Sequence, residues 1–211
     1  MMQGVDYSAG YTAQVPAALV KHGYAFVMRY VSHAGNPKNI GPVELTALHA
    51  AGLGVGIVFE TTAERALHGE AGGKHDAHAA HEQLAALGLG RAAVYFAVDF
   101  DATGTQMDTV LEYIRGAASV LGGDRTGVYG GISVIDACAA AGACTFFWQT
   151  SAWSHGKISP HAHLYQHIYD RTIAGVQLDI NDLRKPDAGI TWPRGAPPLP
   201  VLAEGDRGAP R

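Results

Sequence analysis

Eight short apolar segments, separated by helix-like segments through most of the chain, constrain the fold more than any other feature. They are rich in β-branched and aromatic residues, as buried parallel strands are. Strands that alternate with helices predict an α/β protein, and eight of them predict a (β/α)8 TIM-like barrel. An open doubly wound sheet is the alternative, but no Gly-x-Gly-x-x-Gly motif follows an early segment. The expected strands cover residues 4–8, 25–31, 55–60, 93–101, 126–131, 145–150, 163–167 and 176–180.

Helical patterns occupy most connections between the first six of these strands. Proline near a first turn, hydroxyl caps and closing glycines mark their ends. The last third of the chain carries no convincing helical pattern, so we expect missing or degenerate helices there. The expected helices lie near 16–22, from Pro42 to the closing Gly52, from Gly72 or Gly73 to Leu87, from a Thr105 cap to Leu121, and over 134–141.

The composition excludes several classes of protein. The 211 residues are 47% hydrophobic, which is enough for one sizeable core. A net charge of −4 without a basic cluster argues against a nucleic-acid or anionic-membrane surface, and we expect a monomer with neither partner. The sequence shows no basic and apolar leader and no apolar run of membrane-spanning length, so we expect no Sec-type signal peptide and no membrane span. Cys138 and Cys144 are expected to be small buried thiols, with a local disulfide as the alternative.

The C-terminal segment differs in composition from the rest. Residues 195–200 are rich in glycine and proline and predict an extended linker. The following eight residues, 201–208, resemble the opening of a peptidoglycan-binding repeat, although an ordinary disordered tail explains them equally well. We therefore expect a barrel over 1–194 and a linker or tail over 195–211, with a covalently linked wall-binding domain as one interpretation.

Five carboxylates fall at the expected ends of strands: Asp6, Glu60, Asp99, Asp101 and Asp179. In a barrel these ends converge on one face, where active sites of this fold lie. Glycoside hydrolysis needs such a group, because one carboxylic acid protonates the leaving oxygen while an anion supports the cationic transition state. Each acid alone is more simply explained as a helix cap or a salt-bridged strand end. All five together favour a catalytic site.

Two groups of histidines have spacings that invite comparison with metal sites. His75, His78 and His81 recur at steps of three on an expected helix, where neighbours can share an ion. The third lies nearly two turns from the first, so we interpret the row as a solvated helix face and expect no metal and no cofactor. A zinc site among His161, His163 and His167 is similarly disfavoured. No Gly-x-Ser-x-Gly motif supports a Ser-His-Asp hydrolase.

Several motifs carry a resemblance to a known family. In chain order they are Gly4-Val5-Asp6-Tyr7-Ser8, Met28-Arg29-Tyr30-Val31, Tyr95-Phe96-Ala97-Val98-Asp99-Phe100-Asp101, Gly127-Val128-Tyr129-Gly130, Trp148-Gln149-Thr150 and Val176-Gln177-Leu178-Asp179-Ile180-Asn181. This order resembles the bacterial and phage glycoside-hydrolase-like TIM-barrel domain related to the family 25 lysozymes. Those lysozymes are muramidases that cut the N-acetylmuramic acid to N-acetylglucosamine bond. The likeness covers about residues 3–192.

The resemblance implies roles for the acids. Asp6 and Asp179 match the acids of the first and last strands, and Asp99 matches the first acid of the family 25 Asp-x-Glu motif. Asp101 stands where that motif has its general-acid glutamate, and it is shorter by about 1.5 Å. A displacement of that size can cost about a hundredfold in rate. Either Glu60 or Asp101 is therefore expected to protonate the leaving oxygen while Asp99 stabilises the cation.

The same resemblance implies a peptidoglycan substrate. Aromatic and amide side chains near the strand ends are expected to contact the sugars, together with one acid: Tyr7, Tyr30, Tyr129, Trp148, Gln149, Gln166 and Asp179. We expect a muramidase-like, endolysin-type glycan hydrolase, with a non-catalytic peptidoglycan-binding barrel as the alternative. An amidase or peptidase would need a metal or a nucleophile. Without a signal peptide, action at the cell wall would follow phage-lysin-like release or non-classical export.

Overall fold

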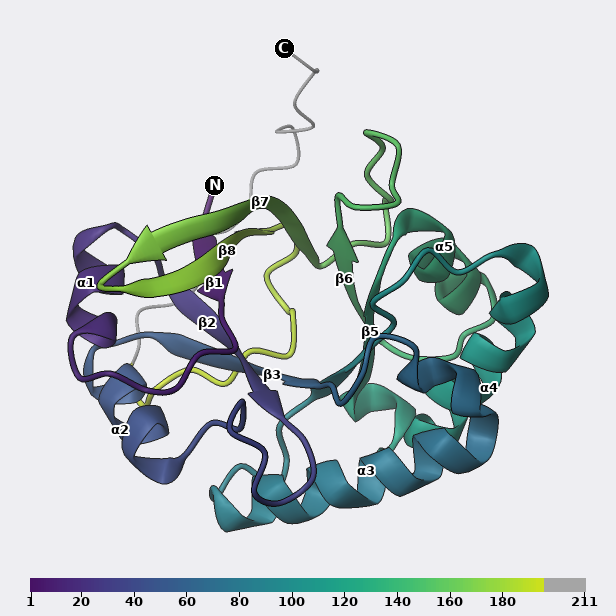
Figure 1. Ribbon diagram of the computed structural model, residues 1–211, viewed down its shortest axis with the longest axis horizontal. Coiled ribbons are helices and arrows are strands. Elements are labelled where there is room, and N and C mark those ends of the chain that lie inside the picture. The colour runs from purple at the N-terminus through teal and green to yellow at the C-terminus, as the bar shows by residue number, and fades with distance from the viewer. Residues whose placement is uncertain (196–211) are drawn as a thin grey trace.

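A computed structural model describes residues 1–195 as a closed barrel of eight strands in sequential order (Figure 1). Neighbouring strands from β1 to β7 run parallel, whereas β8 runs antiparallel to both β7 and β1. The predicted α/β barrel class is confirmed, with one strand reversed. The strands are β1 Gln3–Asp6, β2 Phe26–Val31, β3 Gly54–Phe59, β4 Val94–Ala97, β5 Thr126–Gly130, β6 Phe146–Thr150, β7 Leu164–Ile173 and β8 Val176–Leu183.

The helices lie outside the barrel alongside the strands up to β6, while β7 and β8 project as a hairpin (Figure 1). No helix follows α5 within residues 1–195, as the sequence indicated. One cap differs from its prediction, because the capping residue of α4 is Thr103 and its backbone N–H donates to Gln106 Oε1 at 2.9 Å. The helices are α1 Val15–Lys21, α2 Pro42–Ala50, α3 Gly69–Ala86, α4 Gly104–Leu121 and α5 Ile132–Ala140, with 3-10 turns at Arg65–His68 and Gly123–Arg125.

The reversed direction of β8 changes the position of one predicted site residue. Asp179 lies in the N-terminal half of β8 and not at its C-terminal end. Because β8 is antiparallel to β1, this half pairs with the C-terminal end of β1, and Asp179 is directly opposite Asp6. The expectation that Asp179 ends a strand is therefore wrong, although the residue still reaches the face on which the parallel strands end.

The opposite end of the barrel is closed by the segment that follows β8. Thr191 pairs with Val55 at the start of β3, and the Tyr95 hydroxyl donates to the Ala188 carbonyl at 2.8 Å. Gly54 has no room for a side chain, because a Cβ there would lie 2.7 Å from Ile190. The barrel is thus filled at the N-terminal ends of its parallel strands.

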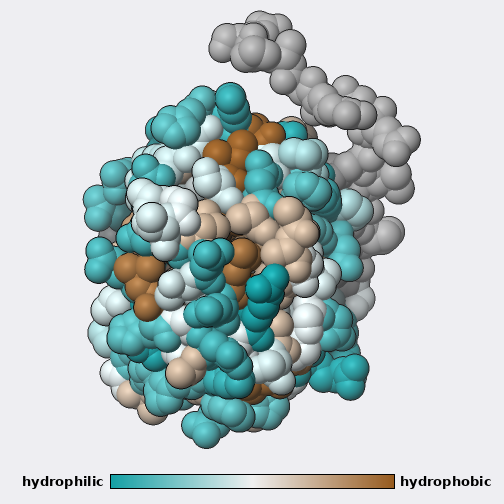
Figure 2. Space-filling view, turned by 90° about the vertical axis from the view of Figure 1, so that its right-hand side faces the viewer, coloured by the Kyte–Doolittle hydropathy of each residue, from teal (hydrophilic) through white to brown (hydrophobic). Residues whose placement is uncertain are grey.

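The buried apolar residues form two clusters, one that includes Phe96 and Tyr113 and one that includes Tyr95 and Trp148. On the face shown in Figure 2, hydrophobic residues form small patches separated by hydrophilic ones. Among residues 1–195, none of the helices is both long and apolar enough to span a membrane.

Cys138 and Cys144 are free, with Cys138 buried, so the alternative disulfide is absent from the described residues. Of the expected linker and tail at 195–211, all residues after 195 lie outside the described part of the chain.

Helices α3 and α4 approach closely through two glycines. A Cβ at Gly73 would lie 1.9 Å from the Tyr113 carbonyl oxygen, and one at Gly116 would lie 2.3 Å from the Glu70 carbonyl oxygen. Both clashes involve backbone atoms, which cannot rotate away. The close contact places the Tyr113 side chain against α3, where its hydroxyl donates to Asp76 Oδ2 at 2.8 Å.

Replacing Gly116 by alanine should therefore force the helices apart and lower the free energy of unfolding by about 1–3 kcal/mol. Gly104→Ala is the matched control on the same helix, because nothing lies within 4 Å of a Cβ there. Urea unfolding followed by circular dichroism measures both. Equal stabilities for the two variants would contradict the close packing.

Candidate functional site

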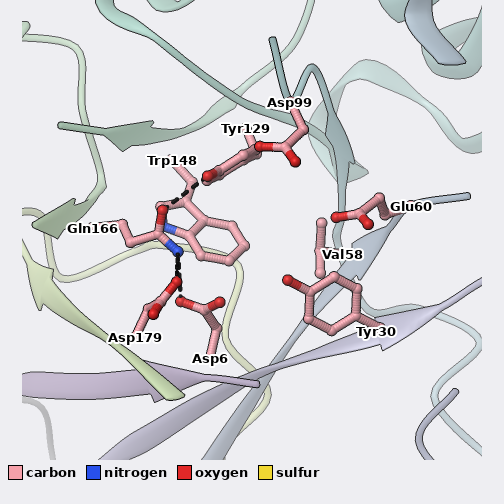
Figure 3. A pocket seen from close by; sticks show the side chains of 9 residues that line it. All are labelled: Asp6, Tyr30, Val58, Glu60, Asp99, Tyr129, Trp148, Gln166 and Asp179. Atoms are coloured by element: carbon pink, nitrogen blue, oxygen red, sulfur yellow. Dashed lines mark hydrogen bonds between the residues drawn. The ribbon is translucent and has the colours of Figure 1, made fainter. Parts of the chain in front are cut away.

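A cavity of about 130 Å³ opens at the C-terminal ends of the parallel strands. Every strand contributes a side chain: β1 to β5 from their last residues or the turn just after them, β6 from its middle, and β7 and β8 from their N-terminal halves. This convergence follows from closing the barrel, which brings all eight strand ends to one rim. The nine lining residues are Asp6, Tyr30, Val58, Glu60, Asp99, Tyr129, Trp148, Gln166 and Asp179 (Figure 3).

Eight of these nine were predicted site residues, and three other predicted residues lie elsewhere. Asp101 is the first, because β4 ends at Ala97 and the regular alternation of side chains stops there. The chain then turns, with the Asp99 backbone N–H donating to the Ala63 carbonyl at 3.3 Å. Asp99 is half-buried in the cavity wall, whereas Asp101 is exposed to solvent. The expectation that both acids project into one site is therefore wrong.

Tyr7 and Gln149 are buried in networks beside the cavity. The Tyr7 hydroxyl donates to Glu44 Oε1 at 2.7 Å, and the Arg29 guanidinium, which pairs with Glu44, lies over the Tyr7 ring. Gln149 donates to the Lys157 carbonyl and accepts from the Ser159 backbone N–H, both at 2.8 Å. These two side chains thus hold loops around the site and do not line it.

Asp6 is held by two amide groups, the predicted site residue Gln166 and Asn181, for which the sequence predicted no role. Asn181 Nδ2 and Gln166 Nε2 both donate to Asp6 Oδ2, at 2.7 and 2.9 Å. The Trp148 indole N–H donates to Asn181 Oδ1 at 2.7 Å, and an indole nitrogen can only donate. This contact fixes which end of the Asn181 amide faces Asp6. Two-residue spacing from Asp179 on β8 was the signal that could have found Asn181.

Gln166 connects the two sides of this network. Its Oε1 accepts from the Tyr129 hydroxyl at 2.8 Å, and its Nε2 also lies 3.3 Å from Asp179 Oδ2 (Figure 3). The other oxygen of Asp179 accepts from the Asp170 backbone N–H at 2.9 Å, in a bulged part of the β7–β8 hairpin. The hairpin thereby orients Asp179 toward Asp6.

Burial raises the pKa of three cavity carboxyl groups. The pKa of Asp6 rises from 3.8 to about 7, chiefly because the group is desolvated and additionally because Asp179 and Glu60 repel its charge. The hydrogen bonds from Asn181 and Gln166 oppose this rise. Desolvation is also the main cause that raises the pKa of Asp99 and of Asp179. A proton is therefore retained in the cavity near neutral pH.

Glu60 is paired with a cation that sequence reasoning missed. Lys38, from the loop between β2 and α2, places its Nζ 2.6 Å from Glu60 Oε1 and 5.4 Å from the centre of the Tyr30 ring. Glu60 is the first residue after β3, one position beyond the strand on which it was predicted to be the last residue. Its charge raises the pKa of Asp99, and the charge of Lys38 lowers it. A single lysine in a loop of glycine, proline and asparagine gave no signal of this contact.

Comparison with known families and proteins agrees with this geometry. Residues 17–184 match the family model described as Rv2525c-like, glycoside hydrolase-like domain. The chain belongs to the Rv2525c-like glycoside hydrolase-like family. A relative in this family, "Putative peptidoglycan hydrolase Rv2525c" of Mycobacterium tuberculosis, is 32% identical over 199 residues, which cover 88% of this chain and 82% of that protein. The predicted resemblance is confirmed.

Solved structures show the same barrel fold. The crystal structure of the Mycobacterium tuberculosis Tat-secreted protein Rv2525c in complex with L-tartrate superposes with a TM-score of 0.83 and 30% identity, covering 90% of this chain and 98% of that one. A family 25 glycosyl hydrolase from Bacillus anthracis gives 0.60 and 14% identity, covering 89% and 90%. At that identity the likeness to the lysozyme is one of fold. The Rv2525c-like family thus shares its barrel with the family 25 enzymes.

The pKa of Asp6 predicts a pH-dependent effect on stability. The pKa of Asp6 is higher in the folded protein than in the unfolded chain, so ionisation of Asp6 lowers the free energy of unfolding. This penalty is absent below about pH 4 and reaches its full size, up to about 4 kcal/mol, above about pH 7. Asp6→Asn removes that penalty. Its free energy of unfolding, relative to wild type, should therefore rise as the pH increases from about 4 to about 8.

Urea unfolding at several pH values measures this difference. Asp101→Asn is the control, since Asp101 is exposed, and its difference from wild type should stay small across the range. A pH-independent difference for Asp6→Asn would show that Asp6 titrates normally.

Proposed function

We propose that this protein hydrolyses a glycosidic bond of peptidoglycan by carboxylate acid–base catalysis, as a muramidase-like enzyme. The observation that carries the proposal is a cavity with carboxyl groups at two opposite sides. Asp6 and Asp179 lie together on one side, and Asp99 and Glu60 on the other (Figure 3). The half-buried Tyr30 and Tyr129 and the buried Trp148 complete the wall. Separated carboxyl groups that differ in protonation are what glycoside hydrolysis requires.

Asp6 is the candidate for the general acid. A general acid must carry a proton at the working pH, and its pKa of about 7 meets this condition. Both amide donors contact Oδ2, so Oδ1 is left to carry the proton toward the cavity. Asp101 is exposed outside the cavity, and Glu60 would have to release Lys38 before it could act as an acid.

Asp99 is then the anion that supports the developing positive charge. It faces the cavity opposite Asp6 and is more accessible than Asp6 to a substrate entering from solvent (Figure 3). In this proposal Asp99 acts on the anomeric carbon, either directly or through the 2-acetamido group of the sugar. Glu60 and Lys38 position each other beside it, and Asp179 and Gln166 orient sugar hydroxyl groups.

The relatives support the substrate class and the place of action. Rv2525c carries the name of a peptidoglycan hydrolase, and its crystal structure describes it as Tat-secreted. By extension we propose that this protein also meets its substrate outside the cytoplasm. The family 25 enzymes share only the fold at their level of identity, so the particular bond that is cut rests on the geometry of the cavity.

One observation favours a second candidate, a barrel that binds peptidoglycan without cutting it. The residue that occupies the general-acid position of the family 25 motif, Asp101, lies outside the cavity. The remaining acids and aromatic groups could hydrogen-bond and stack on sugars without transferring a proton. Product formation separates the two candidates, because a binding module releases no new reducing ends.

Incubation with purified peptidoglycan, followed by mass spectrometry of the soluble fragments, tests the proposal. We expect muropeptides with a reducing muramic acid from wild type, and a rate lower by about 10²–10⁴-fold in Asp6→Asn and Asp99→Asn. Asp101→Asn is the matched control and should keep the wild-type rate. Sedimentation of wild type with the insoluble wall without any released fragment would favour the binding module.

The pH dependence of the same reaction tests the assignment of the acid. If Asp6 must be protonated, kcat/KM should fall about tenfold for each pH unit above about 7. A profile that stays flat up to about pH 9, in an enzyme that is active, would assign the proton to another group.

A further inference from the structure

A group of potential metal ligands lies outside the cavity and has no part in the proposed reaction. His33 follows β2, in the loop that also carries Lys38, and His75 and Asp76 lie in the first half of α3. One ligand atom from each residue lies within 4.8 Å of the other two. In the sequence, His75 lies in a row with His78 and His81. In the folded protein, His75 lies beside His33, which is distant in sequence.

Asp76 is a fixed ligand at the base of this group. It is fully buried, and Arg65 donates to both its oxygens, from Nε to Oδ2 and from Nη2 to Oδ1, each at 2.7 Å. The Tyr113 hydroxyl also donates to Oδ2, at 2.8 Å. Oδ1 therefore accepts one hydrogen bond, whereas Oδ2 accepts two. A carboxylate oxygen has two lone pairs, so Oδ1 retains the capacity to bind a further group.

His33 lies near Asp76 Oδ1, and His75 lies beside His33. His33 Nε2 is 3.8 Å from Asp76 Oδ1, and the His33 and His75 rings are 5.1 Å apart between centres. The edge of the His33 ring packs against Phe59, which restricts its orientation. The His33 side chain is nevertheless 46% exposed, and His75 is exposed as well, so an ion has open access from solvent.

The spacing fits a site that contracts slightly when an ion enters. Ligands about 2.0–2.1 Å from a tetrahedral zinc are about 3.4 Å from one another. The three ligand atoms here are at most 4.8 Å apart, so each separation must shorten by about 1.4 Å or less. Small rotations of the two exposed imidazoles supply that movement, while Asp76 stays in place.

The charge of the group selects the kind of ion. Arg65 neutralises Asp76, so with neutral imidazoles the three ligands and Arg65 carry no net charge. Mg²⁺ and Ca²⁺ depend on several oxygen ligands and gain little here. Imidazole nitrogen suits zinc and the later first-row metals, with an open position left for water. We propose that His33, His75 and Asp76 form a binding site for one divalent ion of the zinc type.

Such an ion would also connect two parts of the fold. His33 and Lys38 belong to the same loop between β2 and α2, and α3 carries the other two ligands. A bound ion would therefore fix this loop to α3, on the side of the barrel from which Lys38 reaches Glu60. The site itself does not depend on whether the cavity is catalytic, since none of its ligands lines the cavity.

Titration calorimetry of the full untagged chain with ZnCl₂ tests the proposal. We expect one Zn²⁺ per chain, and an affinity lower by at least about tenfold in His33→Gln and in His75→Gln. His78→Gln and His81→Gln are the matched controls, since both residues are exposed on the same helix, and should bind as wild type does. All four replaced residues are exposed, and circular dichroism verifies that each variant is folded.

The absorption spectrum after Co²⁺ is added gives a second, independent measurement. Intense visible bands of a four-coordinate ion are expected in wild type and in the two control variants, and loss of these bands is expected in the two ligand variants. Absence of Zn²⁺ binding by wild type would overturn the proposal. Equal affinities for all variants, or equal losses in ligand and control variants, would also overturn it.

Discussion

The buried Asp6 carboxyl group, at the junction where the first and last strands close the barrel, is the constraint on which the rest of the site depends. An unpaired carboxylate in that position would be very costly, and the structure satisfies it with two amide donors from β7 and β8. Trp148 of β6 fixes one of those amides. Side chains from four adjacent strands are therefore ordered around a single acid. The same burial that requires these partners keeps a proton on Asp6 near neutral pH.

The charge of the cavity is lower than its composition implies. Four carboxyl groups face one another there, and Lys38 is the one lysine or arginine that makes an ion pair with them within residues 1–195. Burial raises the pKa values of Asp6, Asp99 and Asp179, and repulsion from neighbouring cavity carboxylates adds to the rise for Asp6 and Asp99. Lys38 lies on the side of the cavity that holds Glu60, and its charge lowers the pKa of Asp99.

Local sequence patterns were sufficient to predict the strands, because a buried strand needs an apolar run. They also predicted most site residues, because these lie in such runs or directly after them. They were insufficient where tertiary structure decides the direction of a strand or the residue at which it ends. The end of β4 at Ala97 separates Asp99 from Asp101, and no local pattern marks that end. Asp179 was assigned to the right face through the wrong reasoning, since only pairing with β1 reveals that β8 is reversed. Lys38, Asn181 and His33 act through partners distant in sequence, which single-segment patterns cannot reveal.

The reversed last strand has a consequence for how the molecule can be attached to something else. Because β8 runs back toward the start of β1, the Leu183 N–H donates to the Met2 carbonyl, and the chain then crosses beneath the barrel as far as Trp192. Both the first residues and the last described ones are therefore on the side away from the cavity. Immobilisation through either end, on a bead, a particle or a neighbouring domain, would leave the mouth of the barrel facing outward. A polymer too large to diffuse could then be reached by a tethered molecule as readily as by a free one.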